Sequence, residues 1–586
     1  MNNGITNNWF FRSIKLLSIY TTILFISSDF NGTNAQVVNN KTNESGIMKI
    51  TGTPVYKKFN INKISTWIKN DGKSDINPNG LSGFEYPRQS GKTAVYQSGL
   101  LWGGKVDGQI RVGGSTYRQG TVPGKILNSG VPASQLEAED PDAPNVRNYR
   151  VRPDYLVGSV QAEIDDGEGS ESEIRDAYQL DWNEWPASDG APFEDIDNDG
   201  VYNPEIDIPG IPGADQTIWF VCNDTDPIQT QFMYGSSPMG IEEQVTVWGY
   251  NEMGPLGSML FKKYVLINKS NTTIDDFFIS IWNDPDVGDA ADDFVGCDTT
   301  LSITYAYNAY PLDQIYGSSP PAVGFDLLQG PIVPGNPTDT ARYFDRYVIG
   351  KKNLPVSAHY FFINVDPIWR DPLLGQYEGA IQFYNFFQGK VGITGEPFTD
   401  PTTSDTTKFA LYGDPVTGTG WIDGILHQPG DRRAGLAAGP FNMEPGDTQE
   451  VVIATIIAIG SNNLNSITLL KSYVLTAQEK YDNLFDIVTG VYDDELYNPI
   501  DFKLSQNYPN PFNPSTKISW QSSVGSWQVL KVFDILGKEI TTLVNEYKPT
   551  GSYEVEFNAS ALSSGVYYYQ LRAGAYIETK KMLLEK

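Results

Sequence analysis

A short acidic segment near residue 200 has the spacing of a calcium-binding loop. Residues 195–203 read D-I-D-N-D-G-V-Y-N, with a carboxylate at every second position and a glycine after the third. This spacing directs oxygens toward one cation, the glycine permits a sharp turn, and the next residue offers a carbonyl oxygen. Ile206 stands where an EF-hand has its bidentate glutamate, so Glu205 or Asp207 must substitute. We therefore predict calcium rather than a solvated acidic turn, with the ligand set Asp195, Asp197, Asp199, Val201, Asn203, Glu205 and Asp207.

A second group of acids follows a predicted strand that ends near residue 282. Carboxylates crowded together repel one another unless a cation lies among them. The spacing matches no strict metal-binding template, so three interpretations remain open: a second calcium site, an exposed loop, or the carboxylate pair of a hydrolase. The residues concerned are Asp284, Asp286, Asp289, Asp292 and Asp293.

Tryptophans near acids raise the question of sugar recognition. Residues 181–185 read D-W-N-E-W, and aromatic rings beside carboxylates can form a sugar-stacking platform or flank the acids of a glycosidase. Four more tryptophans could serve the same purpose. In β-sandwiches, however, tryptophan is more often a packing residue, and we favour that interpretation for Trp102, Trp248, Trp282 and Trp421.

The chain holds only two cysteines and two histidines. This number is too small for a zinc cage of thiolates and imidazoles. Cys222 and Cys297 could pair as a disulfide in an oxidising compartment, or remain as two buried thiols. Neither H-E-x-x-H nor G-x-S-x-G occurs in the chain, so the sequence supports no particular catalytic mechanism, although it does not exclude catalysis.

The overall charge restricts the partners. The 586 residues include 71 acidic and 42 basic side chains, for a formal net charge of -29. Nucleic acid and anionic membrane surfaces would repel such a chain. An excess of carboxylates does favour divalent cations with oxygen ligands, which strengthens the calcium hypothesis.

The pattern of apolar residues predicts a mainly β protein. Glycine and proline are frequent, and short β-branched and aromatic runs lie between them. We expect multidomain antiparallel β-sandwiches. The nearly continuous apolar run 451–457 indicates a strand buried on both faces. The candidate strands are residues 217–222, 244–250, 260–267, 277–282, 301–307 and 450–459.

One long helix is predicted near residues 464–488. Apolar residues recur there at alternating steps of three and four, which is typical of an amphipathic helix. An assembly coiled coil is one interpretation, but a helix this short more often packs on a sheet. Ser170 and Glu173 have capping-box spacing and predict a second, shorter helix.

The amino terminus has the form of a secretory signal. Arg12 and Lys15 precede a short apolar run, and small residues precede a predicted cut between Ala35 and Gln36. That run is too short for a good membrane span, and no later segment qualifies. We expect a signal peptide (1–35), an N-terminal β-rich region with the acidic loop inserted (36–213), a central β-sandwich ending in the helix (214–490), a linker (491–503) and a C-terminal module (504–586).

The C-terminal module carries four ordered motifs. Residues 504–516 read L-S-Q-N-Y-P-N-P-F-N-P-S-T, and residues 532–539 read V-F-D-I-L-G-K-E; S-G-V-Y at 564–567 and K-K-M at 580–582 follow. Alternating apolar and polar residues at 553–557 and 567–571 predict strands of a small immunoglobulin-like sandwich. The motifs resemble those of type A sorting domains of type IX (Por) secretion, and the remainder resembles uncharacterised extracellular proteins with such domains.

This resemblance implies an export route and certain partners. It implies passage through the periplasm, recognition by the type IX machinery, and a final location outside the cell or on its surface. It further implies, in many members, removal of the module by a surface sortase. A sorting signal of this kind does not specify what the rest of the chain does.

For the remainder we expect a calcium-stabilised adhesin or structural surface protein, with surface glycans or self-association as its contacts. The alternative is a protein that binds or hydrolyses carbohydrate through the acids near residues 181–207 or 284–298. A peptidase is a third possibility, disfavoured by the shortage of histidine.

Overall fold

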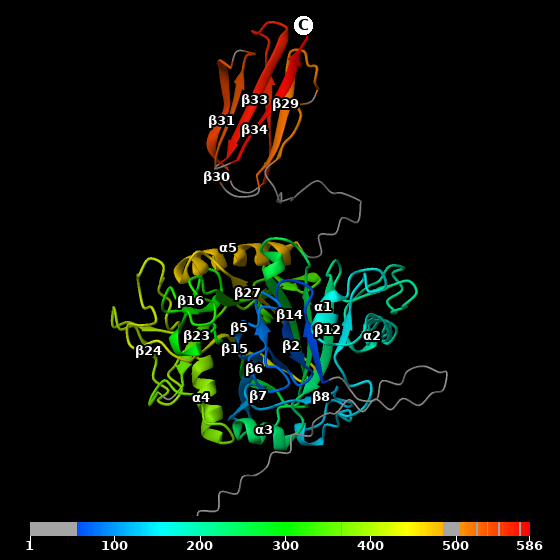
Figure 1. Cartoon of the computed structure of the whole chain (residues 1–586), viewed down its shortest axis with the longest axis vertical. Coiled ribbons are helices and arrows are strands. Elements are labelled where there is room, and N and C mark those ends of the chain that lie inside the picture. Colours follow the sequence, from blue (N-terminus) through cyan, green and yellow to red (C-terminus); the bar gives the residue numbers. More distant parts are fainter. Residues whose placement is uncertain are drawn as a thin grey trace, which may run out of the picture. The chain divides into compact units, whose positions relative to one another are not determined.

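The computed structural model describes residues 55–483 except 365, and residues 503–585 except 508, 523–525, 536, 549–550 and 574–575. The predicted signal peptide with its cut at Ala35 and Gln36, and nearly all of the predicted linker, lie outside the described residues. The chain divides into two compact units, residues 1–485 and 486–586. Figure 1 shows the strands and helices of each unit. No described helix is long and apolar enough to cross a membrane.

One large sheet of the first unit contains eight described strands, all paired antiparallel. Residues far apart in sequence meet in it, as where Trp282 pairs with Gly99 on one side and Gly435 on the other. The order is β1 (Tyr56–Phe59), β2 (Thr66–Lys69), β3 (Lys73–Ser74), β6 (Gln97–Val106), β15 (Ile274–Asp284), β26 (Arg432–Met443) and β23 (Ala358–Ile363), with β7 (Gln109–Gly114) also on β6.

A second large sheet contains nine described strands. The six strands predicted from sequence are all present in these two sheets, which confirms the antiparallel β assignment. The order is β16 (Asp293–Asp298), β17 (Ile303–Asn308), β18 (Ala322–Gln329), β27 (Thr448–Ala458), β14 (Met259–Asn268), β13 (Ile241–Gly249), β12 (Gln216–Asn223) and β8 (Val122–Pro123), with β9 (Tyr149–Val151) also on β12.

The main core lies between the two sheets. Leu100 and Ile281 from the first sheet and Val245 from the second belong to one buried cluster. Strand β27 is buried on both faces, as the nearly continuous apolar run 451–457 predicts. Val451 and Ile453 point into the main core, whereas Val452 and Ala454 point into a second cluster on the outer face.

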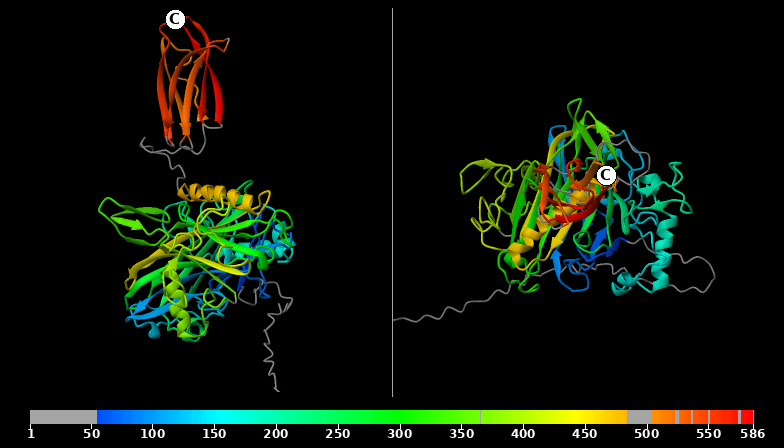
Figure 2. Two further views of the ribbon diagram at one scale, coloured as in Figure 1. Left: turned by 90° about the vertical axis from the view of Figure 1, so that its left-hand side faces the viewer. Right: turned by 90° about the horizontal axis from the view of Figure 1, so that it is seen from above.

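Helix α5 (Asn463–Asp482) covers that outer face, as Figure 2 shows. Its buried residues Ile467, Leu470 and Val474 pack in the second cluster with β27. Asn462 caps the helix by accepting a hydrogen bond from Asn465 N. The predicted helix is therefore confirmed up to residue 482, and it packs on a sheet. Its predicted continuation to 488 lies outside the described residues.

The other helices are shorter. Helix α2 (Glu171–Asn183) begins with the capping box that Ser170 and Glu173 predict. The remaining α-helices are α1 (Gln161–Asp165), α3 (Pro227–Tyr234) and α4 (Tyr377–Phe387). The loops of the first unit also contain short antiparallel strand pairs. These are β4 (Phe84–Glu85) with β5 (Thr93–Val95), β10 (Phe193–Glu194) with β11 (Ile208–Pro209), β19 (Ile332–Pro334) with β22 (Lys351–Asn353), β20 (Thr340–Tyr343) with β21 (Arg346–Ile349), and β24 (Phe398–Thr399) with β25 (Thr406–Thr407).

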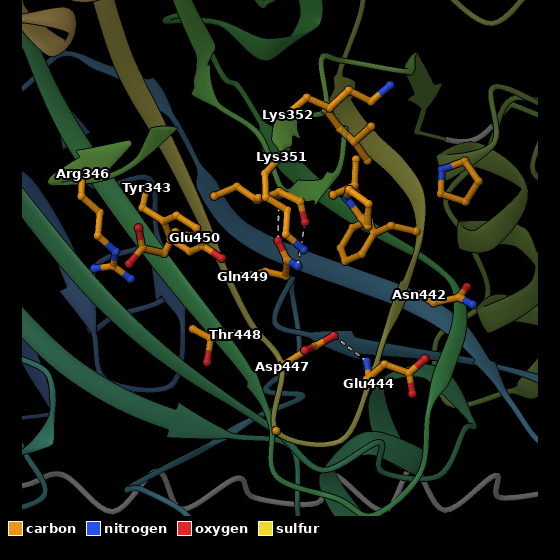
Figure 3. A pocket seen from close by; sticks show the side chains of 17 residues that line it. Tyr343, Arg346, Lys351, Lys352, Asn442, Glu444, Asp447, Thr448, Gln449 and Glu450 are labelled. Atoms are coloured by element: carbon orange, nitrogen blue, oxygen red, sulfur yellow. Dashed lines mark hydrogen bonds between the residues drawn. The ribbon is translucent and has the colours of Figure 1, made fainter. Parts of the chain in front are cut away.

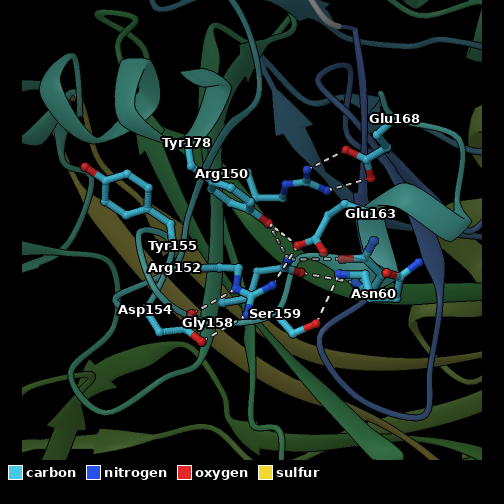
Figure 4. Close-up of polar contacts among 12 residues, drawn as sticks. Asn60, Arg150, Arg152, Asp154, Tyr155, Gly158, Ser159, Glu163, Glu168 and Tyr178 are labelled. Atoms are coloured by element: carbon cyan, nitrogen blue, oxygen red, sulfur yellow. Dashed lines mark hydrogen bonds and ion pairs between the residues drawn. The ribbon is translucent and has the colours of Figure 1, made fainter. Parts of the chain in front are cut away.

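A buried network of ions holds α1 and α2 against the β9 edge of the second sheet (Figure 4). Arg150 contacts Glu168 through two parallel hydrogen bonds, one of them Nη1 to Oε1 at 2.9 Å. Glu163, fully buried in α1, accepts hydrogen bonds from Arg152 at 2.9 Å and from the Tyr178 hydroxyl at 2.7 Å. Glu168 pairs with Arg150 and Glu163 pairs with Arg152, so neither carboxylate is an unpaired charge. The network therefore holds both helices in place.

The predicted boundary between residues 213 and 214 does not separate two domains. Strands β1, β2, β3, β6 and β7 lie before it and share a sheet with β15, β26 and β23, which lie after it. Strands β8 and β9 likewise join the sheet of β12. The residues before and after 213 are thus one compact unit, because long-range strand pairing joins them.

The C-terminal unit is a sandwich of two small antiparallel sheets. Trp520, Leu530 and Tyr569 lie in its buried core, as the alternating strand patterns predict. One sheet contains β28 (Lys503–Leu504), β29 (Ser515–Ser522) and β32 (Gly551–Asn558). The other contains β31 (Glu539–Lys548), β30 (Ser526–Phe533), β33 (Gly565–Ala573) and β34 (Tyr576–Leu584).

Candidate functional site

The β10–β11 pair closes the acidic loop predicted to bind calcium. Pairing of Glu194 with Ile208 brings the two ends of the loop together. One carboxylate oxygen from each of Asp195, Asp197 and Asp207 lies within 4.8 Å of the others. Asp207 is buried and accepts hydrogen bonds from Ile196 N at 2.9 Å and Asn203 N at 2.7 Å. Of the two acids considered as substitutes for the EF-hand glutamate, Asp207 and not Glu205 therefore belongs to this cluster.

The remaining predicted ligands of this loop shape its backbone. Asp195 accepts hydrogen bonds from Asp199 N and Gly200 N, and Asp199 accepts one from Val201 N. Asn203 accepts a hydrogen bond from Glu205 N. Gly200 has a φ of 77°, which a glycine adopts without strain. Loss of hydration, followed by the charge of Asp199, raises the pKa of Asp197, because the acids oppose one another's ionisation.

The second acidic segment contributes to a different cluster from the one predicted. Asp284, at the end of β15, and Asp286 lie with Asp431, which immediately precedes β26, and their closest oxygens are again within 4.8 Å. Asp431 was not among the predicted residues. Nothing in the local sequence marks it, because Asp431 reaches Asp284 only through the pairing of β15 with β26, in which Asn283 lies opposite Ala434.

Arg433 is the cation around which these carboxylates gather. Its Nη1 lies 2.6 Å from Asp431 Oδ1, and its Nε lies 3.3 Å from Asp284 Oδ1 and 3.6 Å from Asp371 Oδ1. Its Nε also donates a hydrogen bond to the Tyr117 hydroxyl. Burial raises the pKa of Asp284 well above its usual range and that of Asp286 to about 6, although the charge of Arg433 opposes both shifts. A cavity of about 260 Å³ lies beside Arg433, Asp371 and Tyr117.

The other acids of that segment have separate contacts. Asp289 Oδ1 accepts a hydrogen bond from Ala291 N, and Asp292 accepts one from Asn308 Nδ2 at 2.6 Å. Asp293 is fully buried and accepts a hydrogen bond from Val287 N at 3.0 Å. The predicted group of five is thus divided between the Arg433 cluster and the turn that follows it.

The cysteines and the first histidine are structural. Both cysteines are free and buried, so the structure contains the thiol alternative and not the disulfide. The Cys222 thiol donates to Glu243, whereas Cys297 contacts the Ala410 carbonyl oxygen. His359 is buried between Thr304 Oγ1 at 2.9 Å and the Ala410 carbonyl at 2.6 Å. Burial lowers the pKa of His359 to about 4, so the ring is neutral at pH 7.

The four tryptophans considered as a sugar platform are buried side chains. Trp102, Trp248, Trp282 and Trp421 are each 0 % exposed, which matches the packing interpretation. In the D-W-N-E-W segment, Trp185 is also buried, and Trp182 donates to the Pro204 carbonyl. These residues provide no exposed aromatic strip.

A polar groove of about 1080 Å³ lies on the first unit (Figure 3). One wall is the arm formed by β19 to β22, and the other is the turn between β26 and β27. The Gln449 side chain joins the two, since it accepts from Ile332 N at 2.8 Å and donates to Ile332 O at 3.1 Å. Lys351 and Lys352 line the groove, and neither ammonium group has an ion pair among the described residues.

In the C-terminal unit the first sorting motif is part of the fold. Leu504 and Phe512 are buried, and Asn507 N donates to the Tyr569 hydroxyl at 2.8 Å. Residues 506–585 match the family model of the secretion system C-terminal sorting domain. This unit is a type IX sorting domain. The protein is therefore secreted by type IX secretion, with a secreted or cell-surface location, and it interacts with the type IX machinery through this domain.

The comparisons add little about residues 55–485. No curated protein matches the chain. One similar solved structure is a polysaccharide lyase, which is 10% identical over 58% of this chain and 34% of its own, with a TM-score of 0.17. The chain thus spans about a third of that protein's length, and so low a TM-score supports no conclusion about fold or activity.

Proposed function

We propose that this exported protein is a calcium-stabilised surface component, acting as an adhesin or structural element outside the cell. The observation that carries the proposal is the convergence of Asp195, Asp197 and Asp207 on one point of a loop closed by two short strands. Hard oxygen ligands of this kind suit calcium. The ion would cross-link the long loop and stabilise the folded state without performing chemistry.

A calcium titration of thermal unfolding tests the proposal. The full-length chain is melted with calcium and with a chelator, and calcium should raise the Tm, since a ligand bound only to the folded state stabilises it. In the variant Asp195→Asn with Asp207→Asn, the part of this rise due to the loop should disappear. Asp176→Asn, an exposed acid of α2, is the matched control and should keep the full rise. Equal rises in all three proteins would refute a calcium site in this loop.

The surface location is tested on intact cells of a strain with type IX secretion. Antibody against residues 55–485 should label unbroken cells, and adhesion or surface integrity should decline when the protein is absent. Removal of the sorting domain by a surface sortase, with anchoring of the remainder, would appear as a shortened surface form. Labelling only after lysis would contradict the proposal.

Carbohydrate binding is the second candidate, favoured by the groove beside Lys351 and Lys352. Its volume is suitable for a ligand of several sugar rings, and its lining offers donors and acceptors from both walls. A glycan-binding screen of the full chain should find a ligand whose affinity falls when both lysines become alanine. Lys408→Ala, an exposed lysine elsewhere, is the control. Unchanged affinity in the double variant would exclude the groove as the binding site.

A further inference from the structure

Two chain segments meet at the Arg433 cluster, where strand β15 of the first sheet ends and strand β26 begins. Asp284 ends β15, Asp286 belongs to the turn that follows, and Asp431 precedes β26. The antiparallel pairing of Asn283 with Ala434 brings these segments together, although almost 150 residues separate them in sequence. Each of the three acids contributes one oxygen to a space in which all three oxygens lie within 4.8 Å of one another.

The three clustered acids have few hydrogen-bond partners, so their carboxylate oxygens can accept further contacts from a ligand. Asp284 is only 2 % exposed, so water can reach little of it. Asp286 forms neither a hydrogen bond nor an ion pair among the described residues. Asp431 accepts from Asn364 Nδ2 at 2.9 Å and contacts Arg433, but each carboxylate oxygen can accept more than one bond.

An independent observation comes from Asp293. Its Oδ2 accepts from Val287 N, next to Asp286, and its carbonyl oxygen accepts from Gly430 N at 3.1 Å, next to Asp431. The side chain is fully buried, and its Oδ1 has no hydrogen-bond donor among the described residues. A buried carboxylate oxygen without a donor is costly, and it lies between the segments that carry two of the clustered acids.

The excess of carboxylates over cations near Arg433 also indicates a bound cation. Asp284, Asp371 and Asp431 contact the guanidinium of Arg433, and Asp286 and the buried Asp293 lie in or next to the adjoining turn between β15 and β16. Arg432, the adjacent cation, is committed to Asp423 at 2.9 Å. Buried negative charge in this excess is stable only if protons or a further cation neutralise it.

We propose that Asp284, Asp286 and Asp431 bind a divalent cation, calcium by the oxygen chemistry, with Asp293 Oδ1 as the adjoining buried oxygen. The ion would fasten the β15–β16 turn to the start of β26, and Arg433 would hold the acids together from the other side. This site is separate from the loop at 195–207, so it extends the calcium-stabilised function proposed above and does not depend on that loop.

Counting bound ions separates the two sites. The full-length chain is freed of metal with a chelator and then titrated with calcium by calorimetry. Two ions per chain are expected. Asp195→Asn with Asp207→Asn should leave one, and Asp286→Asn with Asp431→Asn should leave the other. In each case the affinity of the altered site should fall more than about tenfold, because loss even of outer-shell partners has effects of that order.

The outcomes distinguish the two proposals. If the loop variant loses all binding, the second site is refuted and the loop site stands. If the Asp286 and Asp431 variant loses all binding, the loop site is refuted and the second site stands. Asp289→Asn, an acid of the same turn outside the cluster, is the matched control and should retain two ions. Circular dichroism establishes that each variant is folded, and the single change Asp286→Asn replaces the double variant if that one unfolds.

Discussion

At the scale of single residues, Glu243 is a carboxylate buried beside Cys222 of the main core. It is 1 % exposed on β13 and accepts a hydrogen bond from the Cys222 thiol at 3.1 Å. Burial raises the pKa of Glu243 to about 8. At pH 6 the folded protein therefore carries a proton here that an unfolded chain, with a glutamate pKa near 4.3, has released.

This difference predicts a pH dependence of stability. Between about pH 4.5 and pH 8 the folded state holds more protons at this site, so Glu243 makes the free energy of unfolding fall with rising pH, by at most about 1.4 kcal/mol per pH unit. Glu243→Gln removes this contribution. The Tm of the variant relative to the wild type should therefore increase from pH 5 to pH 8.

Melting curves at several pH values in the presence of chelator check this prediction without interference from calcium. Glu171→Gln, an exposed position of α2, is the control and should follow the wild-type curve. A constant Tm difference between Glu243→Gln and wild type across this range would mean that Glu243 is ionised in the folded state.

At the scale of elements, α5 gives a direct comparison of two neighbouring leucine positions. Leu470 is fully buried against the outer face of the second sheet, whereas Leu475 is 56 % exposed. Leu470→Ala should lower the free energy of unfolding by about 2–5 kcal/mol, because it leaves a cavity. Leu475→Ala should change it by about 0.5 kcal/mol or less.

Denaturant titration of both variants measures these values. Equal effects, together with a change of oligomeric state for Leu475→Ala, would instead support the assembly coiled coil that the heptad-like spacing allows. The helix would then use its exposed face as well as its buried one.

At the scale of the whole molecule, the two units have separate buried cores. Deletion of residues 504–586 should therefore leave the Tm of the first unit unchanged within about 2 °C, because no core residue of that unit is removed. The same deletion should retain the protein in the periplasm. Melting of the purified proteins and cell fractionation measure the two effects.

A large fall in Tm on deletion would show that the sorting domain stabilises the first unit. Secretion of the truncated chain would show that its export signal lies elsewhere. The two results are independent, so each tests a different property of the C-terminal unit.

The sequence by itself determined the features that depend on short-range spacing. Period-two and period-3.6 patterns identified the strands, α2 and α5, since a core-facing residue recurs at the spacing of its own element. Four ordered motifs identified the sorting domain. The loop at 195–207 was recognisable because its ligands lie within a few residues of one another.

Only the tertiary structure decided the features that depend on strand pairing. Asp431 joins Asp284 and Asp286, and Cys222 lies apart from Cys297, because of sheet order and register that no local pattern encodes. The predicted division at residue 213 was wrong for the same reason. Strands from both sides of that point hydrogen-bond in common sheets, and hydrogen bonds between distant strands leave no periodic trace in the sequence.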